Sequence, residues 1–136
     1  MAYNDIYIFP AIITKFDDND YNVTFPDFEE IITFGENLKE AYVMAEDALK
    51  LCLFDLYSDE ESIPEPTDIE NILLDKKQVM VLVNVNLKQV IREYDNKAVR
   101  KNLTIPSWLD KEAEKAHINY SQLLQEALIN HLDLDR

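Results

Sequence analysis

The stretch from Val99 to Leu132 constrains the fold more than any other part of this 136-residue chain. Its first seven residues, apart from Lys101, alternate between apolar and polar side chains, which is the pattern of a β-strand. Pro106 then ends the strand and begins a helix, because proline cannot donate a ladder hydrogen bond and fits the first helical turn. The apolar positions of the strand are Val99, Leu103 and Ile105, and the polar positions are Arg100, Asn102 and Thr104.

A unit of one strand and two short helices cannot be stable alone, since its strand edges are unpaired and its core is too small. A second copy solves both problems if the strands pair antiparallel and four helices share one core. The polar strand residues then lie on one face of a two-stranded ribbon that fits the DNA major groove. The alternative is an ordinary β-α-α piece of a larger core. The predicted dimer core consists of Leu103, Ile105, Trp108, Leu123, Leu124, Ala127 and Leu128.

Local charge favours the ribbon over the alternative, because residues 96–105 carry three cations and no anion. The second predicted helix also has a clear start: Asn119 can cap it, Gln122 can reach back, and Ile118 can pack on Leu123. The segments KNLTIP, PSWLDKEAEKA and INYSQLLQEALINHL together resemble a ribbon-helix-helix domain, the class that includes the Arc and MetJ repressors. The resemblance implies DNA contacts from Arg100, Lys101, Asn102 and Thr104, and phosphate binding by the helix start at Asn119 and Ser121.

Charge is divided unevenly along the chain, which has a formal net charge of -14. Residues 1–90 carry 19 acidic and 6 basic side chains, whereas residues 91–136 carry 8 and 7, which together make the 27 acidic and 13 basic residues of the chain. A strongly acidic surface repels nucleic acid and attracts a basic partner, although it can also serve solubility alone. The first part of the chain is therefore predicted to bind a basic protein.

The first 90 residues predict a small α+β domain of order β-β-β-α-β. Pro10 indicates an edge strand or a bulge in the first strand. Gly35, the only glycine, is expected to supply a backbone angle that other residues resist. The apolar run at residues 79–85 predicts a strand buried on both faces or nearly central in the sheet. The strands are expected at residues 6–15, 21–25, 31–34 and 79–85.

A long helix is expected between the third and fourth strands, with Asn37 as its cap and Glu40 three residues later. Residues 90–96 are polar and charged and are interpreted as the connection to the second domain, either irregular or with a turn or two of helix. The predicted domains are residues 1–90, a linker at 91–98, and residues 99–136. The apolar stripe of the helix consists of Leu38, Ala41, Tyr42, Ala45, Leu49, Cys52, Leu53 and Leu56.

Residues 3–86 resemble the HicB antitoxin family, in the order YIFPAIITKFDDNDYNVTFPDFEE, TFGENLKEAYVMAEDALKLCL, SIPEP and VMVLVNV. One departure is FEEII at residues 28–32, where many members have a Pro-Gly-Cys-like turn. The resemblance implies a partial RNase H-like first domain without RNase activity, which binds and blocks a HicA-type toxin, a small basic protein that cleaves mRNA. It also implies a DNA-binding second domain that represses the operon. We assign the toxin surface to Asp17, Asp18, Asp20, Asp27, Glu29 and Glu30.

The enzyme alternative is a metal-dependent nuclease, which needs carboxylates around two metal ions. Asp17, Asp18 and Asp20 share one predicted hairpin turn, where solvated aspartate is common. His117 and His131 are too few for a metal cluster, and one glycine cannot build a phosphate loop. We therefore expect a non-enzyme without cofactor or metal. A repressor that senses a small ligand and has no toxin partner remains the second hypothesis.

The expected location is the cytoplasm, as a soluble protein. The single cysteine forms no internal disulfide, which suits a reducing compartment. The N-terminus lacks the basic and apolar regions of a signal peptide. The longest apolar run, at residues 79–85, is too short to span a bilayer.

Overall fold

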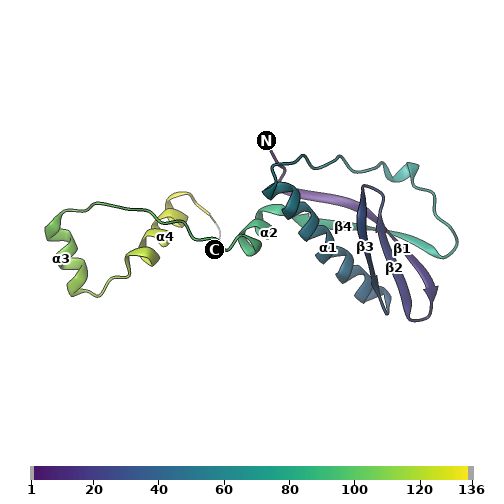
Figure 1. Ribbon diagram of the computed structural model, residues 1–136, viewed down its shortest axis with the longest axis horizontal. Helices are drawn as coiled ribbons and strands as arrows, with labels where there is room; N and C mark the ends of the chain where they lie inside the picture. Colours follow the sequence, from purple (N-terminus) through teal and green to yellow (C-terminus); the bar gives the residue numbers. More distant parts are fainter. Residues whose placement is uncertain (1, 135–136) are drawn as a thin grey trace. The chain divides into compact units, whose positions relative to one another are not determined.

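The computed structural model describes residues 2–134, and the chain divides into two compact units, residues 1–97 and 98–136 (Figure 1). The architecture is mixed α+β, with one four-stranded antiparallel sheet and four α-helices. Among the described residues, no helix is both long and apolar enough to cross a membrane. The elements are β1 (Ile6–Asp17), β2 (Asp20–Phe25), β3 (Phe28–Gly35), α1 (Leu38–Ser58), a 3-10 helix (Ile69–Asn71), β4 (Gln78–Asn86), α2 (Leu87–Tyr94), α3 (Ser107–Lys115) and α4 (Tyr120–His131).

The sheet has the strand order β3-β2-β1-β4, so β1 is a central strand. Pro10 was expected to mark an edge strand or a bulge, and β1 is not an edge strand as a whole, although it has a free edge at Pro10. Pro10 lies opposite Leu82 of β4, but the β1–β2 ladder begins only at Ile12. Proline is tolerated here because β1 has a strand neighbour on one side only at this position.

The strand predicted at residues 79–85 is confirmed as β4, but it is an edge strand and not a central one. Val83 and Val85 are fully buried, while Leu82 on the opposite face is half exposed. Side chains alternate between the two faces of a strand, so only one face of β4 contributes to the core. The apolar run thus overstated how much of the strand is buried.

Helix α1 lies across one face of the sheet (Figure 1). Ala41, Ala45, Leu49 and Leu53 are completely buried, and their four-residue spacing places them on one helix face. Leu38, which the predicted stripe included, is half exposed. The predicted cap is confirmed, since the Asn37 side chain accepts a hydrogen bond from the Glu40 N–H at 2.8 Å.

Gly35 serves a different purpose from the one expected. Its φ is not positive, so it supplies no left-handed backbone angle. A Cβ atom at this position would lie 2.8 Å from Ala41 Cα and from the Glu40 carbonyl carbon, both of which are backbone atoms. The glycine is therefore required because α1 crosses the end of β3 at very close range.

Helix α2 belongs to the first unit, whereas residues 91–98 had been interpreted as a linker. Leu87 and Val90 are buried in the core, and the Asn86 side chain caps the helix by accepting from the Gln89 N–H at 3.1 Å. Contacts place the boundary between the units at Lys97 and Ala98. The packing of α2 on the first unit was not predicted, because residues 90–96 are mostly polar. One short apolar face is enough to pack an eight-residue helix against the core.

The second unit contains α3 and α4 at the predicted places. The Asn119 side chain caps α4 by accepting from the Gln122 N–H at 3.1 Å, as predicted. The Tyr120 hydroxyl donates to the Asp110 carboxylate at 2.6 Å and so joins α4 to α3. Residues 99–105 have no regular secondary structure in the described single chain. The predicted strand requires a second copy as its pairing partner, so it stays a prediction.

Candidate partner-binding surfaces

The acidic residues assigned to a toxin surface fall into two groups. Asp17, Asp18 and Asp20 lie at the β1–β2 turn, before β2, while Asp27, Glu29 and Glu30 lie after it. The two groups are therefore at opposite ends of β2, so a partner that contacts all six must extend along the whole strand. In the first group, Asp18 pairs with Lys15 at 3.7 Å, and its N–H donates to the Asp17 carboxylate at 2.8 Å. These are the bonds of a solvated hairpin turn.

Asp27 joins two segments of the first unit by hydrogen bonds. Its carboxylate accepts hydrogen bonds from the Thr67 N–H at 3.0 Å and from the Thr67 hydroxyl at 2.6 Å. These bonds tie the segment between α1 and β4 to the β2–β3 turn across 40 residues of sequence. A carboxylate that is already used in this way is poorly available to a partner. Sequence reasoning missed the role because Thr67 is remote in the chain.

Glu30 lines a groove of about 330 Å³ between β3 and α1. Asp55 in the last turn of α1 and Asp59, which directly follows the helix, line the same groove. Ile32 and Leu51 supply exposed apolar surface there. We call this feature the acidic groove. Its full lining is Glu30, Ile31, Ile32, Ala48, Leu51, Cys52, Asp55, Leu56 and Asp59.

Asp55 and Asp59 were not among the sequence candidates, yet a signal for them was present. They are four residues apart near the end of a helix whose last turn has no basic residue. Negative charge at a helix C-terminus is unfavourable because the dipole places its negative end there. Carboxylates in this position do not stabilise the helix, and a basic partner would neutralise them.

The lone cysteine, Cys52, is half-buried at the side of the acidic groove. Its Sγ lies 3.6 Å from the Glu30 carboxylate, to which the thiol donates a hydrogen bond. Burial, followed by the negative charge of Glu30, raises the pKa of Cys52 to about 12. Both causes disfavour the thiolate, so Cys52 is an inert thiol and not a nucleophile.

Alkylation of Cys52 should be slow in the folded protein. Iodoacetamide reacts with the thiolate, so we expect a rate at pH 8 at least about tenfold below that of the unfolded chain. Glu30→Gln should increase the rate, because it removes the negative charge while keeping the side-chain shape. Mass spectrometry of the alkylated protein measures both rates. Equal rates in folded and unfolded protein would contradict the assigned environment.

The carboxylates considered for metal-dependent nuclease chemistry do not converge. Asp17, Asp18 and Asp20 are at one end of β2, and Asp27 is at the other, bonded to Thr67. Within residues 2–134, no group of three or more His, Cys, Asp or Glu side chains could hold a metal ion. His131 ends α4, and His117 follows α3 in a left-handed conformation with φ of 55°.

The residues assigned to DNA contact are exposed. Arg100, Lys101, Asn102 and Thr104 lie in the extended segment before α3, and Ser121 is in the first turn of α4. Asn119 uses its side-chain oxygen to cap α4, so it orders the helix start. The hydrogen bond to Asp110 raises the pKa of Tyr120, beside this helix start, to about 12. The tyrosine therefore stays neutral and adds no negative charge there.

The residues assigned to a dimer core are not buried by other residues of the same chain. Leu103 is 68% exposed and Trp108 is 67% exposed, and none of the described residues from 98 to 134 is buried. Large apolar side chains this exposed over a whole small unit mark an interaction surface. Ile105, Leu123, Ala127 and Leu128 are also exposed, and Leu124 is partly buried.

Comparison with known proteins assigns the chain to a family. The model described as the HicB-like antitoxin of bacterial toxin–antitoxin systems matches residues 9–128. A 14.9 kDa protein from the rep–hol intergenic region of Haemophilus phage HP1 (strain HP1c1) is 28% identical over 105 residues, which is 75% of each chain.

Two solved structures share the fold over nearly the whole chain. One is a toxin–antitoxin complex from Streptococcus pneumoniae, with 28% identity, a TM-score of 0.58, and coverage of 93% of this chain and 99% of the other. The second is the antitoxin HicB of Burkholderia pseudomallei, with 25% identity, a TM-score of 0.55, and coverage of 93% and 96%. The chain therefore belongs to the family of HicB-like antitoxins of bacterial toxin–antitoxin systems.

Proposed function

We propose that this antitoxin neutralises a HicA-type toxin with its first unit and represses its own operon with its second. The observation that carries the proposal is the family match, which extends through both units, from residue 9 to residue 128. The division of charge supports it, because the acidic residues concentrate before residue 91 and the cationic segment 96–105 follows. In this proposal the first unit is the partial RNase H-like domain of the family, and the chain performs no catalytic step.

The acidic groove is the surface that we assign to the toxin. A small basic protein would meet Glu30, Asp55 and Asp59 together with the exposed apolar surface of Ile32 and Leu51. Charge complementarity accelerates association and selects the partner, and apolar contact supplies affinity. The edge of β3 adds to this surface, since β3 pairs only with β2 in the described sheet.

Charge reversal in the acidic groove should weaken toxin binding. Asp55→Lys replaces attraction by repulsion, so we expect an affinity loss of about tenfold or more, mainly through slower association with a weaker salt dependence. Stopped-flow binding to a catalytically inactive toxin measures this. Glu70→Lys is the matched control, because Glu70 is an exposed carboxylate outside the acidic groove and outside the residues assigned to the toxin surface. If Glu70→Lys weakened binding as much as Asp55→Lys, net charge and not the groove would be responsible.

The second unit would bind DNA as a ribbon-helix-helix dimer. Two copies of residues 99–105 would pair as a ribbon, which would cover Leu103 and Ile105 and present Arg100, Asn102 and Thr104 to base edges. The free N–H groups at the start of α4 would hold a phosphate. The exposure of the apolar residues in the single chain supports this arrangement.

Base reading and phosphate contact can be separated by mutation. Asn102→Ala and Thr104→Ala should each weaken specific operator binding by about 1–3 kcal/mol and relax sequence preference. Lys101→Ala should weaken binding to all sequences alike and reduce its salt dependence. Gel shifts with operator and unrelated duplexes at two salt concentrations distinguish these effects. Operator binding by both Asn102→Ala and Thr104→Ala at the wild-type level would exclude the proposed ribbon contacts.

A ligand-sensing repressor without a toxin partner is the second candidate function. The observation that favours it is a cavity of about 770 Å³ in the first unit, within the size range of small-molecule sites. Ligand-dependent operator binding by the purified chain, in the absence of any toxin, would support this candidate over the first.

A further inference from the structure

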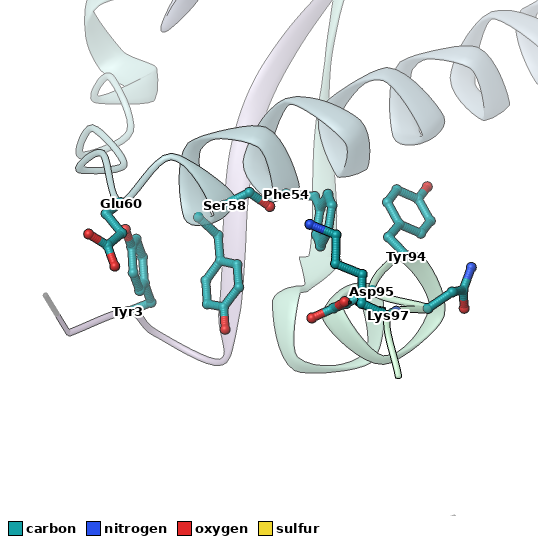
Figure 2. A pocket seen from close by; sticks show the side chains of 9 residues that line it. Tyr3, Phe54, Ser58, Glu60, Tyr94, Asp95 and Lys97 are labelled. Carbon is teal, nitrogen blue, oxygen red and sulfur yellow. Dashed lines mark hydrogen bonds between the residues drawn. The ribbon is translucent and has the colours of Figure 1, made fainter. Parts of the chain in front are cut away.

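The cavity of about 770 Å³ is lined by four aromatic side chains from three separate segments (Figure 2). Tyr3 precedes β1, Phe54 and Tyr57 lie in the last turns of α1, and Tyr94 ends α2. None of the four belongs to the acidic groove or to the second unit. The rest of the lining is Ser58, Glu60, Asp95, Asn96 and Lys97.

The four rings form a continuous row. The ring centroids of Tyr3 and Tyr57 are 5.4 Å apart, those of Tyr57 and Phe54 are 6.3 Å apart, and those of Phe54 and Tyr94 are 5.4 Å apart. The first and last of these pairs meet edge to face, so neighbouring rings are turned steeply to each other. The Tyr3 hydroxyl donates to the Glu61 carbonyl at 2.8 Å, which holds its ring in place. A cation in the cavity could lie against one or two rings of this row at a time.

The carboxylates at the cavity also favour a cation as its ligand. Glu60 and Asp95 both line it, and Glu60 is held beside Tyr3 by its left-handed backbone, with φ of 57°, just after α1 (Figure 2). Desolvation and the Glu60 charge both raise the pKa of Tyr3, so this ring remains neutral and donates through its hydroxyl. The charged side chains of the lining are thus two carboxylates and one ammonium group, that of Lys97, which leaves an excess of negative charge that favours a cation over an anion.

The chain itself contributes one ammonium group to the lining of the cavity, that of Lys97 (Figure 2). Its positive charge would repel an ammonium group that enters from solvent. Removal of the Lys97 charge should therefore improve the binding of a cation, which gives a test of the site.

We propose that this cavity is a binding site for a small organic cation with an alkylammonium group. The aromatic row supplies cation–π contact, and Glu60 and Asp95 neutralise the charge. The proposal does not depend on the toxin or on DNA. Because Asp95, Asn96 and Lys97 directly precede the second unit, a bound cation would contact the segment that connects the two units.

The first test compares choline with its neutral isostere 3,3-dimethylbutan-1-ol on the full-length protein. Both have nearly the same shape, so a difference in affinity reports the charge. We expect choline to bind with a dissociation constant in the millimolar range or tighter, and the isostere to bind at least about tenfold more weakly, which is about 1.4 kcal/mol. Titration followed by two-dimensional NMR should move the signals of Tyr3, Phe54, Tyr57 and Tyr94.

Three variants locate the site. Phe54→Leu keeps an apolar side chain but removes a π face, so choline affinity should fall about tenfold. Phe16→Leu is the matched control, because Phe16 is a 59% exposed aromatic residue on β1 outside the cavity, and it should leave the affinity unchanged. Lys97→Met should tighten binding severalfold. A purely structural role for the aromatic row predicts no gain from Lys97→Met.

The proposal would be overturned by equal binding of choline and its isostere, by NMR shifts outside the cavity, or by no binding at millimolar concentrations. A lysine-containing peptide that binds the cavity when choline does not would also overturn it, and would assign the surface to a protein partner. The thermal stability of each variant, measured without ligand, separates a local effect from misfolding. Failure of any of these tests would leave the proposed antitoxin function unaffected.

Discussion

Leu103→Asp is expected to leave the protein monomeric and unable to bind operator DNA. In the proposed dimer, Leu103 of each copy enters the shared core, and in the single chain it is 68% exposed. Two unpaired carboxylates in that core would each cost several kcal/mol, which exceeds what a small dimer interface can absorb. A monomer loses half of its DNA contacts as well as its pairing strand. Light scattering after size exclusion should show the loss of the dimer directly.

Thr104→Asp is the matched control for this prediction. Thr104 is the next residue along the segment, and in a ribbon its side chain points to the opposite face. It should therefore abolish DNA binding by repelling phosphate while leaving the dimer intact. The first unit should melt at the same temperature in both variants, because residues 1–97 form a separate unit. A Leu103→Asp protein that remained dimeric would refute the predicted strand pairing.

Gly35→Ala is expected to produce the largest loss of stability of any single methyl addition in the first unit. The added Cβ would lie 2.8 Å from Ala41 Cα and from the Glu40 carbonyl carbon, closer than real Cβ contacts. Because these are backbone atoms, α1 itself must shift, and it carries the buried residues Ala45, Leu49 and Leu53. Overpacking of this kind costs about 1–3 kcal/mol or more. Chemical denaturation followed by circular dichroism measures the free energy of unfolding.

The double variant Gly35→Ala, Ala41→Gly distinguishes backbone contact from side-chain crowding. Removing the Ala41 methyl group leaves the clashing backbone atoms in place, so we expect no rescue and a further loss from glycine in a helix. Ile32→Ala is the control on the same strand, since Ile32 is exposed and should cost far less. A Gly35→Ala protein as stable as the wild type would mean that α1 can move away from β3 freely.

Features that depend on neighbouring residues could be predicted from the sequence. The caps at Asn37 and Asn119 were both correct, because a capping side chain reaches a backbone N–H only three residues away. The positions of β4 and α1 were also correct, since apolar runs and helical spacing are local patterns. The order of the four strands and α1 was correct for the same reason.

Features that depend on how the elements pack in space could not be predicted in the same way. The sequence does not show the direction in which α1 leaves β3, which brings Ala41 against Gly35, so the glycine was attributed to a backbone angle. It gives no sign that Asp27 bonds Thr67, and Asp27 was assigned to a partner surface. The position of β4 at the sheet edge likewise depends on which strands pair, which a single apolar run does not specify.

The candidate binding surfaces also differ in whether they could be predicted from the sequence. The cationic segment before α3 and the apolar residues of the second unit are readable from alternation and charge. The acidic groove requires Glu30 to meet Asp55 and Asp59 from a different element, and the aromatic cavity requires Tyr3 to meet Tyr57 and Tyr94. Such groupings arise only when the strands and helices are packed together.

The most direct test of the antitoxin function is purification of this chain with its partners from its native host. The complex would be analysed by light scattering and mass spectrometry, and the co-purifying protein would be isolated and assayed for mRNA cleavage with and without the purified chain. We predict a dimer or larger assembly that contains a small basic protein, whose mRNA cleavage stops when this chain is added. A chain that purifies without such a protein, or that leaves the cleavage activity unchanged, would contradict the proposed neutralisation of a HicA-type toxin.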